Sequence, residues 1–189
     1  MKKIITTILL SAGLLVTQAS AEESKMYVGL DVGTSINTFN VDGGSDIDSD
    51  SINFKLKYGY RLDTDLTLQG YYQYESFDDG VYDKPSSDTL NEIGVDLIKS
   101  FDVESELTPF AQVGIGYGLM SVDKYSESSA SEVGLKIGGG VMYSITPEFD
   151  LLAGIDLQYR NWTDVVEGSN AFAIDETSIQ FYIGSNFNF

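Results

Sequence analysis

The chain ends with FYIGSNFNF, residues 181–189, and this stretch alternates apolar and polar side chains up to its last residue. The apolar parity comprises Phe181, Ile183, Phe187 and Phe189. The other parity comprises Tyr182, Gly184, Asn186 and Asn188. Successive side chains of a β-strand point to opposite faces, whereas the end of a soluble domain is usually frayed and polar. The stretch therefore predicts a strand whose apolar face must stay covered to the end.

The same period of two recurs in seven earlier segments, at about 26–32, 52–60, 66–74, 93–101, 111–119, 133–143 and 151–159. Each segment has roughly the length that a tilted strand needs to cross a bilayer, about ten residues. Short connections at about 61–64, 102–106 and 145–149 alternate with long polar ones at about 35–50, 76–88, 121–130 and 161–175. This arrangement is typical of outer-membrane barrels. We therefore predict an all-β fold, an eight-stranded antiparallel up-and-down transmembrane β-barrel.

Three features indicate that the apolar parity faces lipid. It carries almost no charge, with Lys99 as an exception close to a strand end. Its aromatic residues gather at both strand ends, as in the aromatic girdles of membrane barrels: Tyr58, Tyr60, Phe101, Tyr143, Phe187 and Phe189 at one end, and Phe54, Tyr72, Tyr74, Tyr117, Tyr159 and Phe181 at the other. The opposite parity holds charges and the glycine row Gly114, Gly116 and Gly118, which suits a narrow lumen.

The N-terminus predicts a cleavable signal peptide over residues 1–21. Lys2 and Lys3 precede an apolar stretch, 4–16, that is too short to cross a bilayer as a helix. Ala19 and Ala21 form the small-residue cleavage pattern that follows such a stretch. The mature barrel domain is then 22–189, and the alternative is an uncleaved anchor helix.

Composition excludes several classes of function. The net charge is −18, and removing Lys2 and Lys3 leaves 29 acidic and 9 basic residues, a charge of −20. Such a chain lacks the basic footprint of nucleic-acid binding. It has no cysteine and no histidine, so there is no thiolate and no histidine to activate a nucleophile. We expect no enzyme activity and no cofactor.

The inward parity predicts a lumen charge network of five acidic and five basic residues: Asp31, Lys55, Lys57, Arg61, Glu75, Glu92, Asp96, Lys136, Asp156 and Arg160. An unpaired charge in a narrow lumen is costly, so we expect these groups to pair. One interpretation is a salt-bridged polar plug, and the other is a narrow ion path along the charges. The pairing itself depends on the barrel's shear, which the sequence does not state.

The excess negative charge is predicted to lie outside the lumen, in the four long loops. The acidic residues of these loops comprise Asp42, Asp46, Asp48, Asp50, Asp78, Asp79, Asp83, Asp88, Asp123, Glu127, Asp164, Glu167, Asp175 and Glu176. The motif DIDSDS, 46–51, is similar to the start of a calcium loop. It has Ser51 at the glycine position and Lys57 at the position of the bidentate glutamate. We therefore assign no dedicated metal site, and loose cation bridging to anionic headgroups stays open beside a solvated acidic rim.

Three stretches carry a family resemblance: TPFAQVGIGYGL (108–119), GLKIGGGVMYSITPEFDLLAGIDLQYR (134–160) and the closing Phe189. The chain resembles the small eight-stranded outer-membrane β-barrels, such as the transmembrane domain of outer-membrane protein A and the opacity-type porin-like proteins. The resemblance implies location in the bacterial outer membrane, among lipid and lipopolysaccharide. It also implies that Phe187 and Phe189 form a C-terminal signal for the barrel-assembly machinery.

The resemblance is specific for fold and weak for function. It favours a structural or surface-interaction role, with a largely plugged polar lumen and acidic extracellular loops that could contact a host or matrix ligand. The alternative is a small, low-conductance porin. A third class, a soluble barrel with an apolar ligand, would require the apolar parity to face inward.

Overall fold

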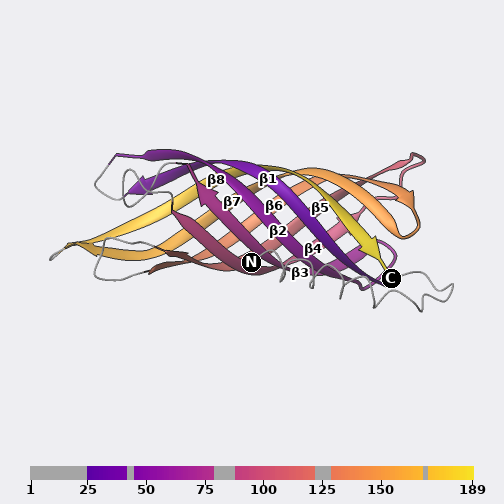
Figure 1. The fold of residues 1–189 in the computed structure, drawn as a ribbon, viewed down its shortest axis with the longest axis horizontal. Helices are drawn as coiled ribbons and strands as arrows, with labels where there is room; N and C mark the ends of the chain where they lie inside the picture. The colour runs from indigo at the N-terminus through magenta and orange to yellow at the C-terminus, as the bar shows by residue number, and fades with distance from the viewer. Residues whose placement is uncertain (1–24, 42–44, 79–87, 122–128, 168–169) are drawn as a thin grey trace, which may run out of the picture.

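The computed structural model describes residues 25–41, 45–78, 88–121, 129–167 and 170–189. They form eight strands in one closed barrel, and the strands run obliquely around it (Figure 1). The strands are β1 Met26–Val41, β2 Ile47–Arg61, β3 Leu66–Phe77, β4 Thr89–Ser100, β5 Leu107–Ser121, β6 Ser129–Thr146, β7 Phe149–Glu167 and β8 Asn170–Asn188. No helix among the described residues is long and apolar enough to cross a membrane.

The barrel is closed, with every strand antiparallel to its sequence neighbours and β8 paired with β1. The closure reaches the last residue, because the amide of Met26 donates to the carbonyl of Phe189 and the amide of Phe189 donates to the carbonyl of Met26, at 3.3 and 2.9 Å. Closure gives each strand a hydrogen-bonded neighbour on both sides, as a sheet in hydrocarbon requires. It explains why the C-terminal alternation continues to Phe189, and it confirms the predicted eight-stranded antiparallel topology.

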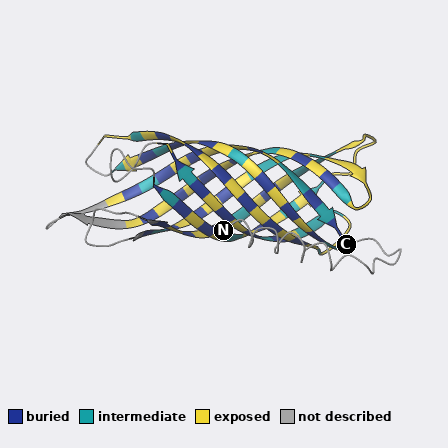
Figure 2. Cartoon of the chain, in the orientation of Figure 1, coloured by how far each residue is buried: buried dark blue, intermediate teal, exposed yellow. Residues whose placement is uncertain are grey.

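Burial alternates along every strand and gives the barrel wall a chequered pattern (Figure 2). On β2, Leu56 is 50% exposed while the neighbouring Lys55 is 1% exposed. On β7, Ile155 is 49% exposed while Asp156 is fully buried. In the middle of the barrel, leucine, isoleucine and valine therefore point away from the lumen, and most charged groups point into it. The prediction that the apolar parity faces outward, toward lipid, is confirmed.

Two of the predicted long loops are wrong. Most of the segment 35–50 belongs to β1 and β2, where Phe39 pairs with Ile47, and most of 161–175 belongs to β7 and β8. The other two predicted long connections, 76–88 and 121–130, fall largely on residues 79–87 and 122–128, which lie outside the described residues. The outer face of a strand needs apolar side chains only at the depth of the lipid. Beyond that depth the outward positions can be polar, and the alternation of apolar outward and polar inward residues is lost. Thr38, Asp48 and Asn161 are outward and polar there, so the sequence pattern resembled a loop.

The predicted signal peptide, with Ala19 and Ala21, lies outside the described residues. Phe187 lies near the end of β8 and pairs with Val28 of β1 and Phe149 of β7, while Phe189 follows the strand. Both side chains are half-buried. Their role as an assembly signal stays a prediction.

Candidate functional site

The middle of the lumen is crossed by three ion pairs between strands. Lys57 of β2 meets Asp31 of β1 at 2.6 Å, and Lys136 of β6 meets Asp96 of β4 at 2.8 Å. Lys55 of β2 lies 3.9 Å from Asp156 of β7, on the far side of the barrel. All six side chains are almost completely buried. These pairs compensate charges that would otherwise be costly to bury.

Tyrosines fill the space between these ion pairs. The ammonium of Lys136 lies 4.1 Å from the ring centre of Tyr71, and that of Lys55 lies 5.1 Å from the same ring and 5.6 Å from the ring of Tyr182. Cations at such distances are attracted by the face of an aromatic ring. The Tyr71 hydroxyl donates to Glu92 at 2.5 Å. The centre of the lumen is therefore filled by side chains, in keeping with an eight-stranded barrel.

Above this layer, toward the long-loop end, Arg160 of β7 binds three carboxylates from three other strands. Its Nη2 lies 2.9 Å from Glu75 of β3 and 3.1 Å from Glu92 of β4, and its Nη1 lies 2.7 Å from Glu176 of β8. Glu176 also accepts a hydrogen bond from the Trp162 indole at 3.1 Å. The fork geometry of a guanidinium suits several carboxylates at once. Arg160 thus ties four strands together across the lumen.

The glycine row on β5 makes room for the acidic side chains beside it. A Cβ on Gly114 would collide with a carboxylate oxygen of Asp96. A Cβ on Gly116 would lie 2.6 Å from Glu92 Oε1 and 2.8 Å from the Tyr71 hydroxyl. Bare backbone at these positions therefore lets the acids of the neighbouring strands reach across the lumen.

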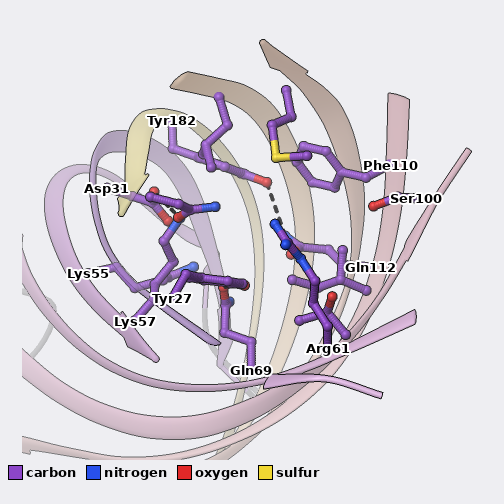
Figure 3. Close-up of a pocket in the computed structure, with 15 residues that line it drawn as sticks. Tyr27, Asp31, Lys55, Lys57, Arg61, Gln69, Ser100, Phe110, Gln112 and Tyr182 are labelled. Carbon is purple, nitrogen blue, oxygen red and sulfur yellow. Dashed lines mark hydrogen bonds and ion pairs between the residues drawn. The ribbon is translucent and has the colours of Figure 1, made fainter. Parts of the chain in front are cut away.

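A small cavity of about 60 Å³, lined by both polar and apolar side chains, lies in the short-turn half of the lumen (Figure 3). Its wall includes Tyr27, Lys57, Arg61, Gln69, Gln112 and Tyr182. Gln112 donates to the Tyr182 hydroxyl at 3.1 Å, and Tyr27 donates to Gln69 at 2.7 Å. Arg61 is only half-buried and donates to Asn188 at 3.1 Å. The cavity is large enough for a few water molecules.

The long-loop end of the lumen is apolar. Seven strands each contribute one buried apolar side chain to a cluster that we call the apolar ring: Phe39, Phe77, Leu90, Met120, Ala130, Trp162 and Ile174. The rings of Phe39 and Phe77 meet edge to face at 5.7 Å, and Phe39 lies 6.3 Å from Trp162. Ile47 of the remaining strand packs against the cluster. The side-chain pattern is therefore inverted here, with apolar groups inside and polar groups outside.

Nine of the ten predicted lumen charges are buried, and Arg61 lies half-buried near one end of the barrel. The predicted balance of five acids and five bases is wrong. The buried acids of the described residues also include Asp88, Glu132, Asp150 and Glu176. The sequence pattern predicts loop positions for Asp88 and Glu176, but Glu176 lies on β8 and binds Arg160.

The missed residues follow the inward parity of their strands. Glu132 continues the row of Gly134 and Lys136, and Glu176 continues the row of Ser178 and Gln180. Extending each parity by one or two positions would have found them. The apolar ring gives no such signal, because its members share the parity of polar lumen residues.

Within the part of the chain that the structure describes, no group of three or more histidine, cysteine or acidic residues could hold a metal ion. Asp46, Asp48 and Asp50 of the DIDSDS motif point outward and are exposed. Asp48 and Asp50 lie on the extended strand β2, whereas a calcium loop must curl around its ion.

The fold and the polar, salt-bridged lumen define a small outer-membrane β-barrel protein. The sequence pattern of the outer membrane protein beta-barrel domain family matches residues 6–187. The chain belongs to this family, and it is a protein of the bacterial outer membrane, surrounded by lipid. A comparison with curated protein sequences finds no match.

Solved structures with the same fold share little sequence with this chain. Neisserial surface protein A (NspA) is 22% identical, with a TM-score of 0.62, and the match covers 87% of this chain and 97% of NspA. Ail of Yersinia pestis, in complex with the heparin analogue sucrose octasulfate, is 17% identical, with a TM-score of 0.52 and coverage of 87% and 99%. The outer-membrane enzyme PagL is 13% identical, with a TM-score of 0.50 and coverage of 80% and 97%. At these identities the likeness concerns the fold alone.

Proposed function

We propose that this outer-membrane barrel has a structural or surface-interaction role and that its lumen does not serve as a pore. The apolar ring is the observation that carries this proposal. It occupies the long-loop end of the lumen, where a porin would need a hydrated entrance. Hydrophobic constrictions exclude water and therefore ions. Below the ring, Arg160 and its three carboxylates fill the cross-section with ion pairs.

Single-channel recording tests the proposal. The mature protein would be refolded in detergent, checked by its heat-dependent gel shift and placed in a planar bilayer. We expect a folded barrel without discrete conductance steps. Reproducible steps would support the alternative, a low-conductance porin.

A pair of variants separates a lumen path from leakage around the protein. Asp156→Asn removes a buried lumen charge, and Asp50→Asn removes an exposed charge on the outer wall. If the wild type conducts and only Asp156→Asn changes the current or its ion selectivity, the lumen is the path. If neither variant alters any current, the current does not run along the lumen charges.

A surface role would use the long-loop end of the barrel, which faces away from the cell. On β2 this end presents Asp48 and Asp50 to the outside. Ail was solved with a polyanionic sugar analogue, but the acidic wall of the present barrel would repel a polyanion. We therefore expect a host or matrix ligand, if one is bound, to be cationic or neutral.

Binding of proteoliposomes to immobilised matrix components would test this role. Asp48→Asn with Asp50→Asn should weaken such binding, and Glu104→Gln, in the short turn between β4 and β5, should leave it unchanged. Equal binding of all variants would show that the outward residues Asp48 and Asp50 of β2 do not contribute to ligand binding.

Catalysis is not part of the proposed function. PagL shows that this fold can carry an enzyme, so the argument rests on residues. The chain has no histidine to activate a nucleophile or water, and the buried acids Asp31, Asp96 and Asp156 are each engaged with a lysine. Lipid hydrolysis by the refolded protein would contradict this.

The remaining proposals concern biogenesis. We propose cleavage of the signal peptide after Ala21, contact with lipopolysaccharide in the outer leaflet, and recognition of Phe187 and Phe189 by the barrel-assembly machinery. N-terminal sequencing of protein extracted from outer membranes should begin at Glu22. A start at Met1 would contradict cleavage.

A further inference from the structure

Glu132 occupies an unusual position at the border between the charged lumen and the apolar ring. It lies on β6, where it pairs with Gly118 of β5 on one side and with Trp162 of β7 on the other. Its side chain is only 1% exposed. One carboxyl oxygen lies over Gly118, in the space that a Cβ there would fill, and Leu90 Cδ1 borders the same space. The carboxyl group of Glu132 thus packs between the backbone of Gly118 and the apolar side chain of Leu90.

Neither oxygen of this carboxyl group has a hydrogen-bond partner among the residues that the structure describes. Glu75, Glu92 and Glu176 all bind Arg160 directly, but Glu132 forms no ion pair with any described residue. Buried polar groups in folded proteins nearly always have a partner, and burying an unpaired carboxylate costs several kcal/mol. An ionised Glu132 is therefore not stable in this position.

The charges around Glu132 make ionisation still less favourable. The facing groups are Glu75 of β3, Glu92 of β4, Arg160 of β7 and Glu176 of β8. On its own strand the next charge is Lys136, which is already paired with Asp96. The positions of β5 beside it are the glycines Gly116 and Gly118. One arginine already faces three carboxylates, and a fourth negative charge would have no counter-charge of its own.

We propose that Glu132 is a proton-binding site that is occupied at neutral pH and controls the apolar ring above it. With the proton bound, the neutral acid packs against Leu90 and the ring stays closed. When the proton leaves, the new carboxylate is repelled by its neighbours and requires water. Water can reach it from the long-loop end only if Leu90 and Trp162 move apart. Alkaline pH therefore opens the ring.

The proton also links folding to pH. In the unfolded chain Glu132 ionises near the ordinary glutamate value of about 4.3, whereas the folded barrel retains the proton. Between that pH and the higher pH at which the folded barrel loses the proton, unfolding releases a proton, so Glu132 makes the stability of the barrel fall as the pH rises through this window. Glu132→Gln removes this contribution, because the amide is neutral in both states.

Trp162 provides a direct readout, because it is the single tryptophan of the chain and a member of the apolar ring. The experiment measures quenching of its fluorescence by acrylamide, a neutral quencher, in refolded barrels in lipid vesicles between acidic and alkaline pH. The wild type should pass from weak to at least severalfold stronger quenching on the alkaline side of neutrality. Glu132→Gln should stay weakly quenched throughout.

Two controls sharpen the result. Asp50→Asn removes an exposed acid from the outer wall and should keep the wild-type transition. Replacing sodium by choline at fixed pH should not move the midpoint. A transition that persists in Glu132→Gln, or that is absent from the wild type, overturns the proposal. A midpoint that follows the sodium concentration also overturns it, because the site would then bind a metal cation and not a proton.

Infrared spectroscopy of the wild type keeps the test independent of whether the variant folds. A protonated carboxylic acid has a C=O stretching band that a carboxylate lacks. This band should be present in the folded barrel at neutral pH and disappear over the pH range of the fluorescence change. Absence of the band at neutral pH would contradict proton binding at Glu132.

Discussion

Arg160 is the shared cation of three buried lumen carboxylates. Replacing it by methionine keeps much of the side-chain volume but leaves Glu75, Glu92 and Glu176 without their shared cation. Removing one partner of a buried ion pair typically costs about 3–5 kcal/mol. We expect Arg160→Met to lower the free energy of unfolding by at least that amount, as measured by urea unfolding in lipid vesicles.

The ion pair between Lys99 and Asp65 is the matched control, because both side chains are nearly half exposed. Exposed pairs contribute less than about 1 kcal/mol, so Lys99→Met should leave the unfolding curve almost unchanged. Equal effects of the two variants would contradict the central role assigned to Arg160.

The glycine row of β5 makes a second prediction at this scale. Gly116→Ala places a Cβ against Glu92 and the Tyr71 hydroxyl, and such overpacking typically costs about 1–3 kcal/mol. Gly70→Ala is the control, because a Cβ there has no heavy atom within 4 Å. It should be neutral or slightly stabilising, since alanine loses less backbone entropy than glycine on folding. A stability loss in Gly70→Ala as large as that in Gly116→Ala would refute the steric argument.

At the residue scale the sequence predicted which side chains enter the lumen but not their partners. Parity alone assigns Lys55 and Asp156 to the inside. Their contact at 3.9 Å crosses the barrel from β2 to β7, and it depends on how far each strand is staggered against the next. Nothing in the local sequence states that stagger.

At the scale of the strand, alternation predicted the parts that cross lipid and failed beyond them. Contact with lipid requires apolar side chains on the outer face, so the alternation of apolar and polar residues is clear between the aromatic girdles. On β1 beyond the lipid, Thr38 and Asn40 point outward while Phe39 points inward. Apolar residues inside and polar residues outside are the pattern of a soluble barrel wall. Because most residues of this stretch are short and polar, its sequence resembles that of a loop.

Amide hydrogen exchange would test the length of these strands. Ser49 pairs with Asn37 and Asp48 pairs with Thr38, so their amides should exchange slowly, like those of the membrane-spanning part. The Asn37 side chain adds hydrogen bonds to Ser49 and Ser51, both at 3.0 Å. Rapid exchange throughout 37–40 and 47–50 would show that the loop prediction was right.

At the scale of the whole molecule, the charges are distributed so that a strongly acidic chain can cross a membrane. The outer face at lipid depth is nearly free of charge, and most of the buried lumen charges are ion-paired. The exposed acids of the described residues lie beyond the apolar band, as at Asp48 near one end of the barrel and Glu104 near the other. The large net negative charge is therefore compatible with the fold.

Labelling of single cysteines along β2 tests the account most directly, because the chain has no cysteine of its own. Asp48→Cys, Ile52→Cys, Leu56→Cys and Tyr58→Cys would be treated in intact cells with a maleimide that does not cross membranes. The account predicts strong labelling at position 48 and little or none at the other three, whose side chains face lipid. Labelling at position 56, or its absence at position 48, would contradict it.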